Sequence, residues 1–360
     1  MSPIVHTIVR VIDTNKFFQF IIHVKVFKGE STISIILPVL IAVTVLVLAI
    51  MLDLIVGDPG PQSSWKVTYK LHPTVLMGRL TKTLEPHLKS QNPKTAKLKG
   101  VILALTVILL FAFAVYFGLW ATYALLGVIV YTLFAIIILK FTICIKLETD
   151  WSYAVAKALE AGDLVEAKKY SHFSRRESKD LNGPQISSAV IESMAENLID
   201  FKLSPIIAYS LLGVTGAIAF RAVNTLDGMV GFKDSEHIHM GWFSANLDTV
   251  INYIPTRLTG VLIVLAAAIL GEDYKNAWAV ARRDHAKTPS RNHGWPMAAM
   301  GGALRVQLEK PGQYVLGDQI EPLTPEKIIK ALKIRNLVIV LWVILCLPVI
   351  WFTRIYFFPY

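Results

Sequence analysis

At 360 residues the chain could hold one large domain or two smaller ones, but its mean hydropathy of +0.52, with only 17% charged residues, is too apolar for an ordinary soluble enzyme. The net charge of +10 fits basic loops on the cytoplasmic side of a membrane, and no basic stripe with interleaved aromatics predicts a nucleic-acid partner. Cys144 and Cys346 lie inside apolar runs, which excludes a disulfide framework and a cysteine-based zinc site.

The first hundred residues predict an extension, a span and a basic loop. Residues 1–34 mix polar and apolar side chains without a cleavage site, and we expect an N-terminal extension that could include an interfacial helix. Residues 35–56 are long and apolar enough to span, with Asp53 near the end. Residues 57–100 carry a clear excess of lysine and arginine, so the positive-inside rule places this loop in the cytoplasm.

The apolar run that follows is too long for one crossing and predicts two spans, 101–120 and 123–146, turning near "GLWATY". Residues 147–200 then read as polar helices. The segments 205–220 and 258–271 are apolar but short, so we expect buried or re-entrant helices there.

A last clear span covers 336–352. The prediction is therefore an all-α, polytopic integral membrane protein. Its domain, 35–360, would contain about four clear spans, the short helices and a helical site region that faces the cytoplasm.

A row of acids marks the first candidate site. In "IESMAENLIDFKLSP" the carboxylates of Glu192, Glu196 and Asp200 recur every four residues, opposite an apolar stripe, although like charges at this spacing destabilise a helix. The row is either a solvated polar face or a set of ligands for a divalent cation, a substrate cation or a proton in general base catalysis.

A second polar stripe lies in "GWFSANLDTVINYIPTR". Asp248 and Asn252 are four residues apart, and Arg257 follows Pro255. Before the stripe, Asn224 and Asp227 stand beside glycines that permit close approach of a ligand to the backbone. A plain turn with Asn and Asp as caps is the alternative.

A third cluster, "ARRDHAKTPSRNHGWPMAAMGGAL", predicts an anion site. Arg282 and Arg283 close one helix, and Ser290, Arg291 and Asn292 precede the start of another. Free N–H groups and the helix dipole favour an anion there, and arginine matches carboxylate or phosphate geometry. The alternative is a capped helix with solvated arginines.

Histidines and known nucleotide motifs add little. His237, His239, His285 and His293 could form a metal site, but they show no strong ligand spacing, and we expect surface or hydrogen-bonding residues instead. The sequence has no GxxxxGK[ST], GxSxG or HExxH motif. The residues alone therefore predict a membrane protein with a cytoplasmic site for anions and cations, without naming a reaction.

Several motifs in order resemble the adenosylcobinamide-phosphate synthase family of cobalamin biosynthesis (CbiB/CobD), over roughly 52 to 317. They are "LDLIVGDP" (52–59), "HPTVLMGRL" (72–80), "ESMAEN" with Asp200 and Pro205, "RAVNTLDGMVG" (221–231), "GWFSANLDTVINYIPTRL" (241–258) and the "RRD" to "GGAL" segment (282–304). Three positions depart from the family pattern: Phe201 replaces a usual glycine, Thr249 a usual second acid and Arg291 a usual proline.

The resemblance implies an integral enzyme of the cell membrane, a carbon–nitrogen ligase with its site facing the cytoplasm. It would join a carboxylate of adenosylcobyric acid to the amine of an aminoalcohol phosphate such as aminopropanol phosphate, driven by ATP with Mg²⁺. A carboxylate is a poor acyl donor, so it must be phosphorylated before the amine attacks. Homo-oligomers, or association with other corrinoid-pathway enzymes, are possible partnerships.

On this resemblance we expect each polar cluster to have a role. The catalytic candidates are Glu192, Glu196, Asp200, Asp227 and Asp248, and those for the metal are Glu192, Glu196 and Asp227. The candidates for substrate and phosphate binding are His72, Asn197, Asn224, Asn252, Arg257, Arg282, Arg283, Ser290, Arg291 and Asn292.

Two other functions stay open. A transporter or channel predicts ionisable residues midway along the spans, whereas Asp53, Lys140 and Lys146 lie near span ends. An AmpE-like membrane sensor or signalling protein could keep the scaffold without the chemistry.

Overall fold

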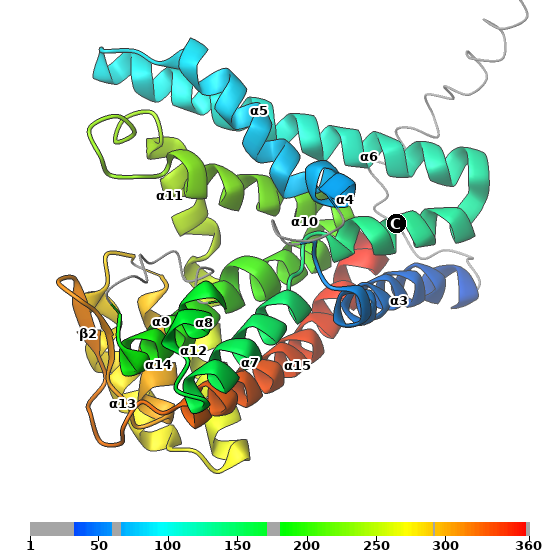
Figure 1. The fold of residues 1–360 in the computed structure, drawn as a ribbon. Coiled ribbons are helices and arrows are strands. Elements are labelled where there is room, and N and C mark those ends of the chain that lie inside the picture. The colour runs from blue at the N-terminus through cyan, green and yellow to red at the C-terminus, as the bar shows by residue number, and fades with distance from the viewer. Residues whose placement is uncertain (1–31, 60–65, 171–180, 291, 358–360) are drawn as a thin grey trace, which may run out of the picture.

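The structure is a computed structural model that describes residues 32–59, 66–170, 181–290 and 292–357. The predicted extension, 1–34, therefore lies almost wholly outside the described residues, as do Arg291 and part of the polar region 147–200. Nearly all described elements are helices (Figure 1), and the exception is a small antiparallel hairpin of β1 (Leu308–Lys310) and β2 (Tyr314–Leu316). The all-α fold class is confirmed.

Five helical stretches among the described residues are long and apolar enough to cross a membrane. They are Ile36–Val56, Pro93–Lys140, Gly183–Val230, Tyr253–Leu270 and Pro325–Tyr356. The first lies in α3 (Thr32–Val56), and the second and last are α6 and α15 (Pro325–Tyr356). The protein is therefore a polytopic membrane protein.

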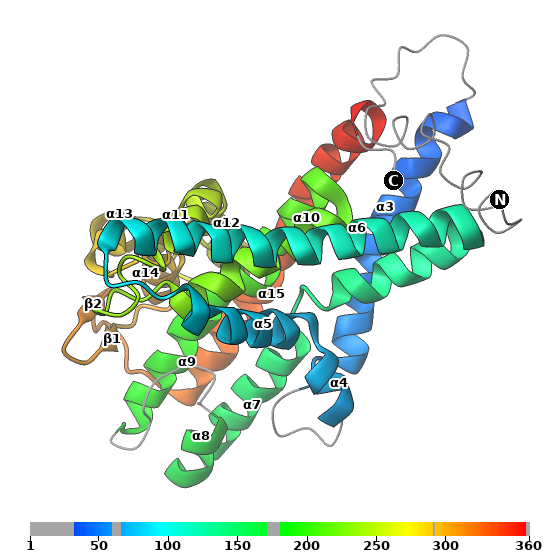
Figure 2. The same ribbon diagram turned by 90° about the horizontal axis from the view of Figure 1, so that it is seen from above.

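Helix α6 (Pro93–Lys140) is a pair of helical arms, as the sequence predicts, but the break lies at Gly127 and not within 118–123. Gly127 has φ 80° and ψ 178°, a conformation that side chains with a Cβ disfavour. The rings of Tyr123 and Tyr131, on either side, approach to 6.0 Å between centroids. Because eight residues of continuous helix span about 12 Å, the chain must turn back here (Figure 2).

A second reversal forms the centre of the molecule. Helix α9 (Gly183–Leu198) continues through a π-helical turn, η2 (Ile199–Leu203), into α10 (Ser204–Val230), which breaks at Gly213 with φ 70°. Arg221 on the second arm donates to the carbonyl of Asp200, 21 residues earlier, at 2.8 Å. A continuous helix would separate them by about 31 Å, so 205–220 forms a helical hairpin, and whether it is buried or re-entrant in the membrane stays a prediction.

The start of α9 follows from its sequence. In "NGP" the Asn182 side chain accepts from the Gln185 N–H at 3.0 Å, and the Gln185 side chain accepts from the Asn182 N–H at 3.1 Å. This reciprocal capping box, with Pro184 in the first turn, fixes where the helix begins.

The remaining helices surround these hairpins. On the N-terminal side are α4 (Lys66–Leu71), α5 (Pro73–Leu88), α7 (Lys146–Glu160) and α8 (Leu164–Tyr170). On the C-terminal side are α11 (Trp242–Ile251), α12 (Tyr253–Leu270), α13 (Tyr274–Asp284), the short 3₁₀ turn η3 (His285–Lys287) and α14 (Gly294–Ala303). Residues 258–271 thus form most of α12, whose 18 residues meet the length for a crossing.

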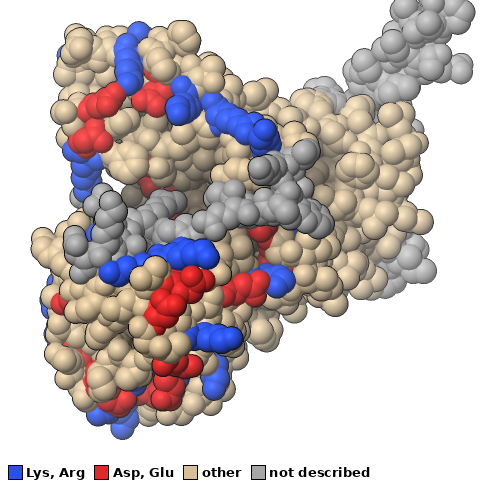
Figure 3. Space-filling model, viewed as in Figure 1, with Lys and Arg blue, Asp and Glu red and all other residues tan. Residues whose placement is uncertain are grey.

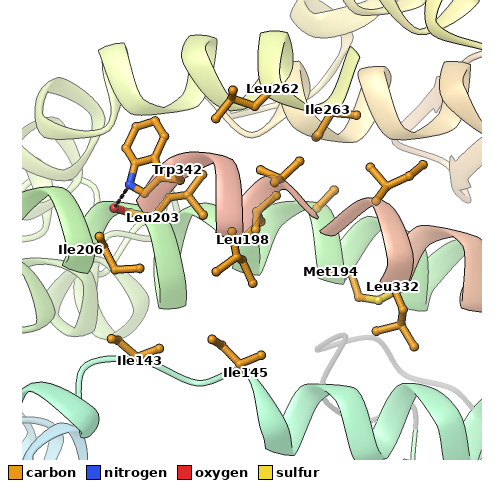
Figure 4. Packing of buried hydrophobic residues seen from close by; sticks show 14 of the residues in the cluster. Ile143, Ile145, Met194, Leu198, Leu203, Ile206, Leu262, Ile263, Leu332 and Trp342 are labelled. Carbon is orange, nitrogen blue, oxygen red and sulfur yellow. Dashed lines mark hydrogen bonds between the residues drawn. The ribbon is translucent and has the colours of Figure 1, made fainter. Parts of the chain in front are cut away.

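The core lies where α9, α12, α15 and the start of α7 meet (Figure 4). Met194 and Leu198 of α9 are fully buried there with Ile263 of α12. Trp342 of α15 donates its indole N–H to the Leu203 carbonyl at 2.9 Å, which anchors the π-helical turn to the last helix. The core thereby holds the carboxylate-bearing segment 192–200 in a fixed position.

Charged side chains gather on one half of the molecule. In Figure 3 they cover the half with α5, α9, α11 and α13, whereas the half with the far ends of α3, α6 and α15 shows almost none. The charged half is hollowed between the arm of α5, α6 and α11 and the body that contains α9, α13 and α14.

Candidate functional site

The predicted row of acids divides between two environments. Glu192 is buried, and its two carboxylate oxygens accept from the Ser188 hydroxyl at 2.7 Å and the Tyr314 hydroxyl at 2.8 Å. Tyr314 belongs to β2, so Glu192 ties α9 to the hairpin. The hydrogen bonds of Glu192 therefore connect α9 to the hairpin, whereas the next two acids contact a histidine.

Glu196 and Asp200, one and two turns later, meet His293 from the loop before α14. The Nδ1 atom of His293 lies 3.3 Å from Glu196 Oε1, and Nε2 lies 3.2 Å from Asp200 Oδ1. Since both ring nitrogens face carboxylate oxygens, both carry protons in this arrangement. Burial alone would lower the pKa of His293, but Asp200 and Glu196 raise it well above its usual range. His293 is therefore a cation between two anions.

The π-helical turn sets the direction of Asp200. Such wide turns are rare and often occur at functional sites. Here the turn buries Lys202, whose Nζ lies 2.7 Å from Glu148 Oε2, an oxygen that Arg335 also contacts at 2.7 Å. Lys202 thus points into the body of the protein while the Asp200 carboxylate points towards His293.

The second arm of α10 carries three more polar residues near this cluster: Arg221, Asn224 and Asp227. Arg221 donates to the Asp200 carbonyl at 2.8 Å and to Asn224 Oδ1 at 3.2 Å, and the Asn224 side chain also hydrogen-bonds to the Asp200 carboxylate. One turn on, a Cβ at Gly231 would lie 2.2 Å from Asp227 Oδ1. Glycine at 231 therefore leaves room for this carboxylate.

Asp248 is the most unusual carboxylate of the site. It is only 6% exposed, and its Oδ1 atom has no hydrogen-bond partner among the residues that the structure describes. Burial, and then the nearby charges of Asp200 and Asp227, raise the pKa of Asp248 to about 7, against the opposing effect of His293. Asn252, fully buried beside it, accepts from the Ser204 hydroxyl at 2.6 Å.

Arg257 and Asn292 form the cationic edge of the cluster. Arg257 donates to Asn292 Oδ1 at 3.2 Å, and its guanidinium lies 3.4 Å from the centroid of the Tyr253 ring. The Asn292 amide donates to the Thr249 carbonyl at 2.9 Å, which joins the loop before α14 to α11. The Ser290 hydroxyl accepts from the N–H groups of Asn292 and His293, so it caps the turn that leads into α14.

Other predicted residues lie in different surroundings. Arg283 pairs with Asp284 at 2.8 Å and with Asp318 at 2.9 Å, and Arg282 lies over the Trp278 ring at 6.0 Å. The carbonyl of Asn197 accepts from Lys202 at 3.4 Å. Arg282, Arg283 and Asn197 thus each contact other residues of the protein. Arg291 is outside the described residues.

His72 belongs to a second polar cluster at the end of α3. It caps α5, and its Nε2 lies 3.6 Å from Asp58, which also contacts Lys140. Asp53, fully buried, accepts from the N–H groups of Ile145 and Lys146 at 2.8 and 3.1 Å. The ionisable residues that a transporter hypothesis would use here are accordingly bonded to one another and to the backbone.

Arg221 and Lys202 had no predicted role, and His293 was expected to be a surface or hydrogen-bonding residue. Their partners are distant in sequence, since Asp200 and Glu148 lie on other elements. The only available signals were the lysine and arginine inside otherwise apolar helical segments, which require a partner when buried.

Comparisons with known proteins agree on one family. The profile of the "CobD/Cbib protein" family matches residues 46–338. The "Probable cobalamin biosynthesis protein CobD" of Methanothermobacter thermautotrophicus is 39% identical over 306 residues, which are 83% of this chain and 95% of that protein. The "Cobalamin biosynthesis protein CobD" of Dehalococcoides mccartyi is 33% identical over 315 residues, 86% and 98% of the two chains. No solved structure matches the chain.

Proposed function

The chain belongs to the CobD/Cbib protein family of cobalamin biosynthesis, and on this premise we propose that it is an ATP-dependent carbon–nitrogen ligase. The reaction joins a carboxylate of adenosylcobyric acid to the amine of an aminoalcohol phosphate of the aminopropanol phosphate type, and it yields adenosylcobinamide phosphate. We further propose that the site faces the cytoplasm of the cell membrane, because the basic loop 57–100 borders the charged half of the protein.

One observation supports this function above all others. Acids from α9, η2, α10 and α11 gather around one imidazole, and Arg257 with Asn292 lies on the adjoining loop and helix. A substrate with an ammonium group at one end and a phosphate at the other requires such a division of charge.

The donor set fits a divalent cation. Glu196 and Asp200 offer carboxylate oxygens, which suit Mg²⁺, and the buried Asp248 oxygen has no partner among the described residues. When bound, Mg²⁺ would neutralise the negative charge of the nucleotide phosphates. Glu196 and Asp200 are the residues that would hold it.

The other groups have roles that follow from their surroundings. Asp248, with a pKa near 7, would take the proton of the attacking amine, since a base works best near the operating pH. Arg257, fixed against Tyr253, would bind a phosphate or the carboxylate that is being activated. Asn224, Asn252 and Asn292 would orient the reacting groups by hydrogen bonds.

The experiment compares two charge-neutralising variants in membranes. Glu196→Gln removes a carboxylate of the site, whereas Glu236→Gln removes an exposed one that pairs with Lys89. We expect amide formation from adenosylcobyric acid to fall by at least about 100-fold in the first and to stay within about twofold in the second. Near-normal turnover of a folded Glu196→Gln protein contradicts the assignment.

A further inference from the structure

We propose that Glu196, Asp200 and His293 form a site for a divalent transition metal, and that the imidazole makes this site prefer Mn²⁺ to Mg²⁺. The use of that metal in catalysis rests on the proposed ligase function, but its binding does not. The predicted metal set of Glu192, Glu196 and Asp227 thereby changes in two of its three members.

The geometry fits one ion. One ligand atom from each residue lies within 4.8 Å of the other two. Ligand atoms bound at about 2.0–2.2 Å from a metal are separated by no more than about 4.4 Å, so small side-chain rotations are enough. Glu196 is 46% exposed, which leaves one side of the ion open to a substrate, as in catalytic metal sites.

The backbone positions of the three residues are fixed. Glu196 and Asp200 lie on a helix and a π-helical turn that are packed in the core, and the Ser290 hydroxyl accepts from the His293 N–H at 3.2 Å. Arg221 and Asn224 hold Asp200 by its carbonyl and its carboxylate. Such outer contacts orient metal ligands before the metal binds.

A second observation points to a missing cation. Asp248 is 6% exposed, and its Oδ1 atom has no partner among the described residues. It lies close enough to Asp200, Asp227 and His293 to interact with all three charges. An unpartnered carboxylate oxygen is expensive to bury, and a metal beside it would stabilise it.

The donor chemistry selects the metal. Mg²⁺ keeps oxygen ligands and several waters, whereas an imidazole nitrogen favours transition metals. Mn²⁺ accepts carboxylates and imidazole together and can still bind phosphate oxygens. In the metal-free protein both ring nitrogens of His293 face carboxylates, so the metal would replace one of the two ring protons, which is released to water. A second three-residue group, Glu85, Glu236 and His237, offers similar donors at similar exposure. The first group is distinguished by the unpartnered Asp248 oxygen, whose carboxylate interacts with the charges of Asp200 and His293.

The test is Mn²⁺ binding to the full-length protein in detergent at pH 8, after removal of metals by EDTA. The electron paramagnetic resonance signal of free Mn²⁺ reports binding, and Mg²⁺ is added as competitor. We expect one Mn²⁺ per chain with at least about tenfold preference over Mg²⁺, and loss of at least about tenfold in Mn²⁺ affinity in His293→Asn. His237→Asn, the matched control, should bind as the wild type does.

Unchanged Mn²⁺ affinity in a folded His293→Asn protein overturns the proposal, as does loss of binding in His237→Asn. Size-exclusion chromatography checks the fold of each variant. If His293→Asn misfolds, Glu196→Gln replaces it, because this half-exposed side chain tolerates the change; the same tenfold loss is then required. Ligase activity is not part of this measurement, so the reaction and the metal site stand or fall separately.

Discussion

The guanidinium of Arg221 lies 4.6 Å from the centroid of the Phe201 ring, across the reversal at Gly213. Phe201 stands where the resemblance led us to expect a glycine, and its ring packs against this guanidinium. The ring covers a buried cation that also holds the Asp200 carbonyl. The departure therefore reinforces the turn that carries Asp200.

We predict that Phe201→Leu lowers the free energy of unfolding by about 1–2 kcal/mol, because it keeps apolar volume but loses the cation–π contact. Phe201→Tyr, which keeps the ring, should change it by less than about 0.5 kcal/mol. Thermal unfolding of both variants in one detergent measures the difference. Equal midpoints for the two variants contradict a role for the aromatic face.

Gly213 is predicted to resist replacement because of its backbone conformation. Its φ of 70° and ψ of −164° are strained for any residue with a Cβ, so Gly213→Ala should destabilise the protein by about 1–3 kcal/mol. Gly118 lies in regular helix with open space around it, and Gly118→Ala should be neutral or slightly stabilising. The yield and thermal midpoint of the two purified variants measure this difference in stability.

Removal of a buried charge behind the site should cost much more stability than removal of an exposed one. Lys202 and Arg335 share the Glu148 carboxylate in the interior, and Glu148→Gln leaves these two buried cations without that counter-charge. We expect a loss of about 3–5 kcal/mol in the free energy of unfolding. The exposed pair Lys146–Asp150 is the control, and Lys146→Met should cost less than about 1 kcal/mol. Denaturant titrations of both variants measure this contrast.

The raised pKa of Asp248 predicts how stability and activity depend on pH. Its pKa is raised to about 7 in the folded protein from about 3.9 in the unfolded chain, so the folded state binds the proton more tightly. Its contribution to stability is present at low pH and is lost as the pH rises from about 4 to about 7. Asp248→Asn removes this dependence.

With EDTA present, the thermal midpoint of Asp248→Asn relative to wild type should therefore rise between pH 5 and pH 8. Amide formation by the wild type should rise with pH up to about 7, since only the carboxylate accepts a proton. A variant that unfolds with the wild-type pH dependence shows that Asp248 is not the group responsible.

The sequence predicted the polar stripes well because each follows helical spacing within one segment. Glu196, Asp200, Asp248 and Asn252 come together in one cluster, and their functional role stays a prediction. Glu192 has the same spacing, yet its contacts are Ser188 and Tyr314, and Tyr314 comes 122 residues later. A local pattern carries no information about such a partner.

The turn in α6 and the contacts of His293 also could not be predicted from local sequence. Small and aromatic residues suggested a reversal at 118–123, but the chain turns at Gly127, because only there does a glycine adopt a positive φ between two apolar arms. His293 was given no ligand role, since its carboxylate partners are 93 and 97 residues away in the chain. Tertiary packing, and not local sequence, brings it to the acids.

The most direct test of the proposed function is mass-spectrometric detection of the amide product. Purified protein in detergent is incubated with adenosylcobyric acid, aminopropanol phosphate and Mg²⁺, with and without ATP. We predict adenosylcobinamide phosphate only in the presence of ATP and only from protein with Glu196 intact. Absence of this product from folded wild-type protein that is supplied with every substrate would contradict the ligase function.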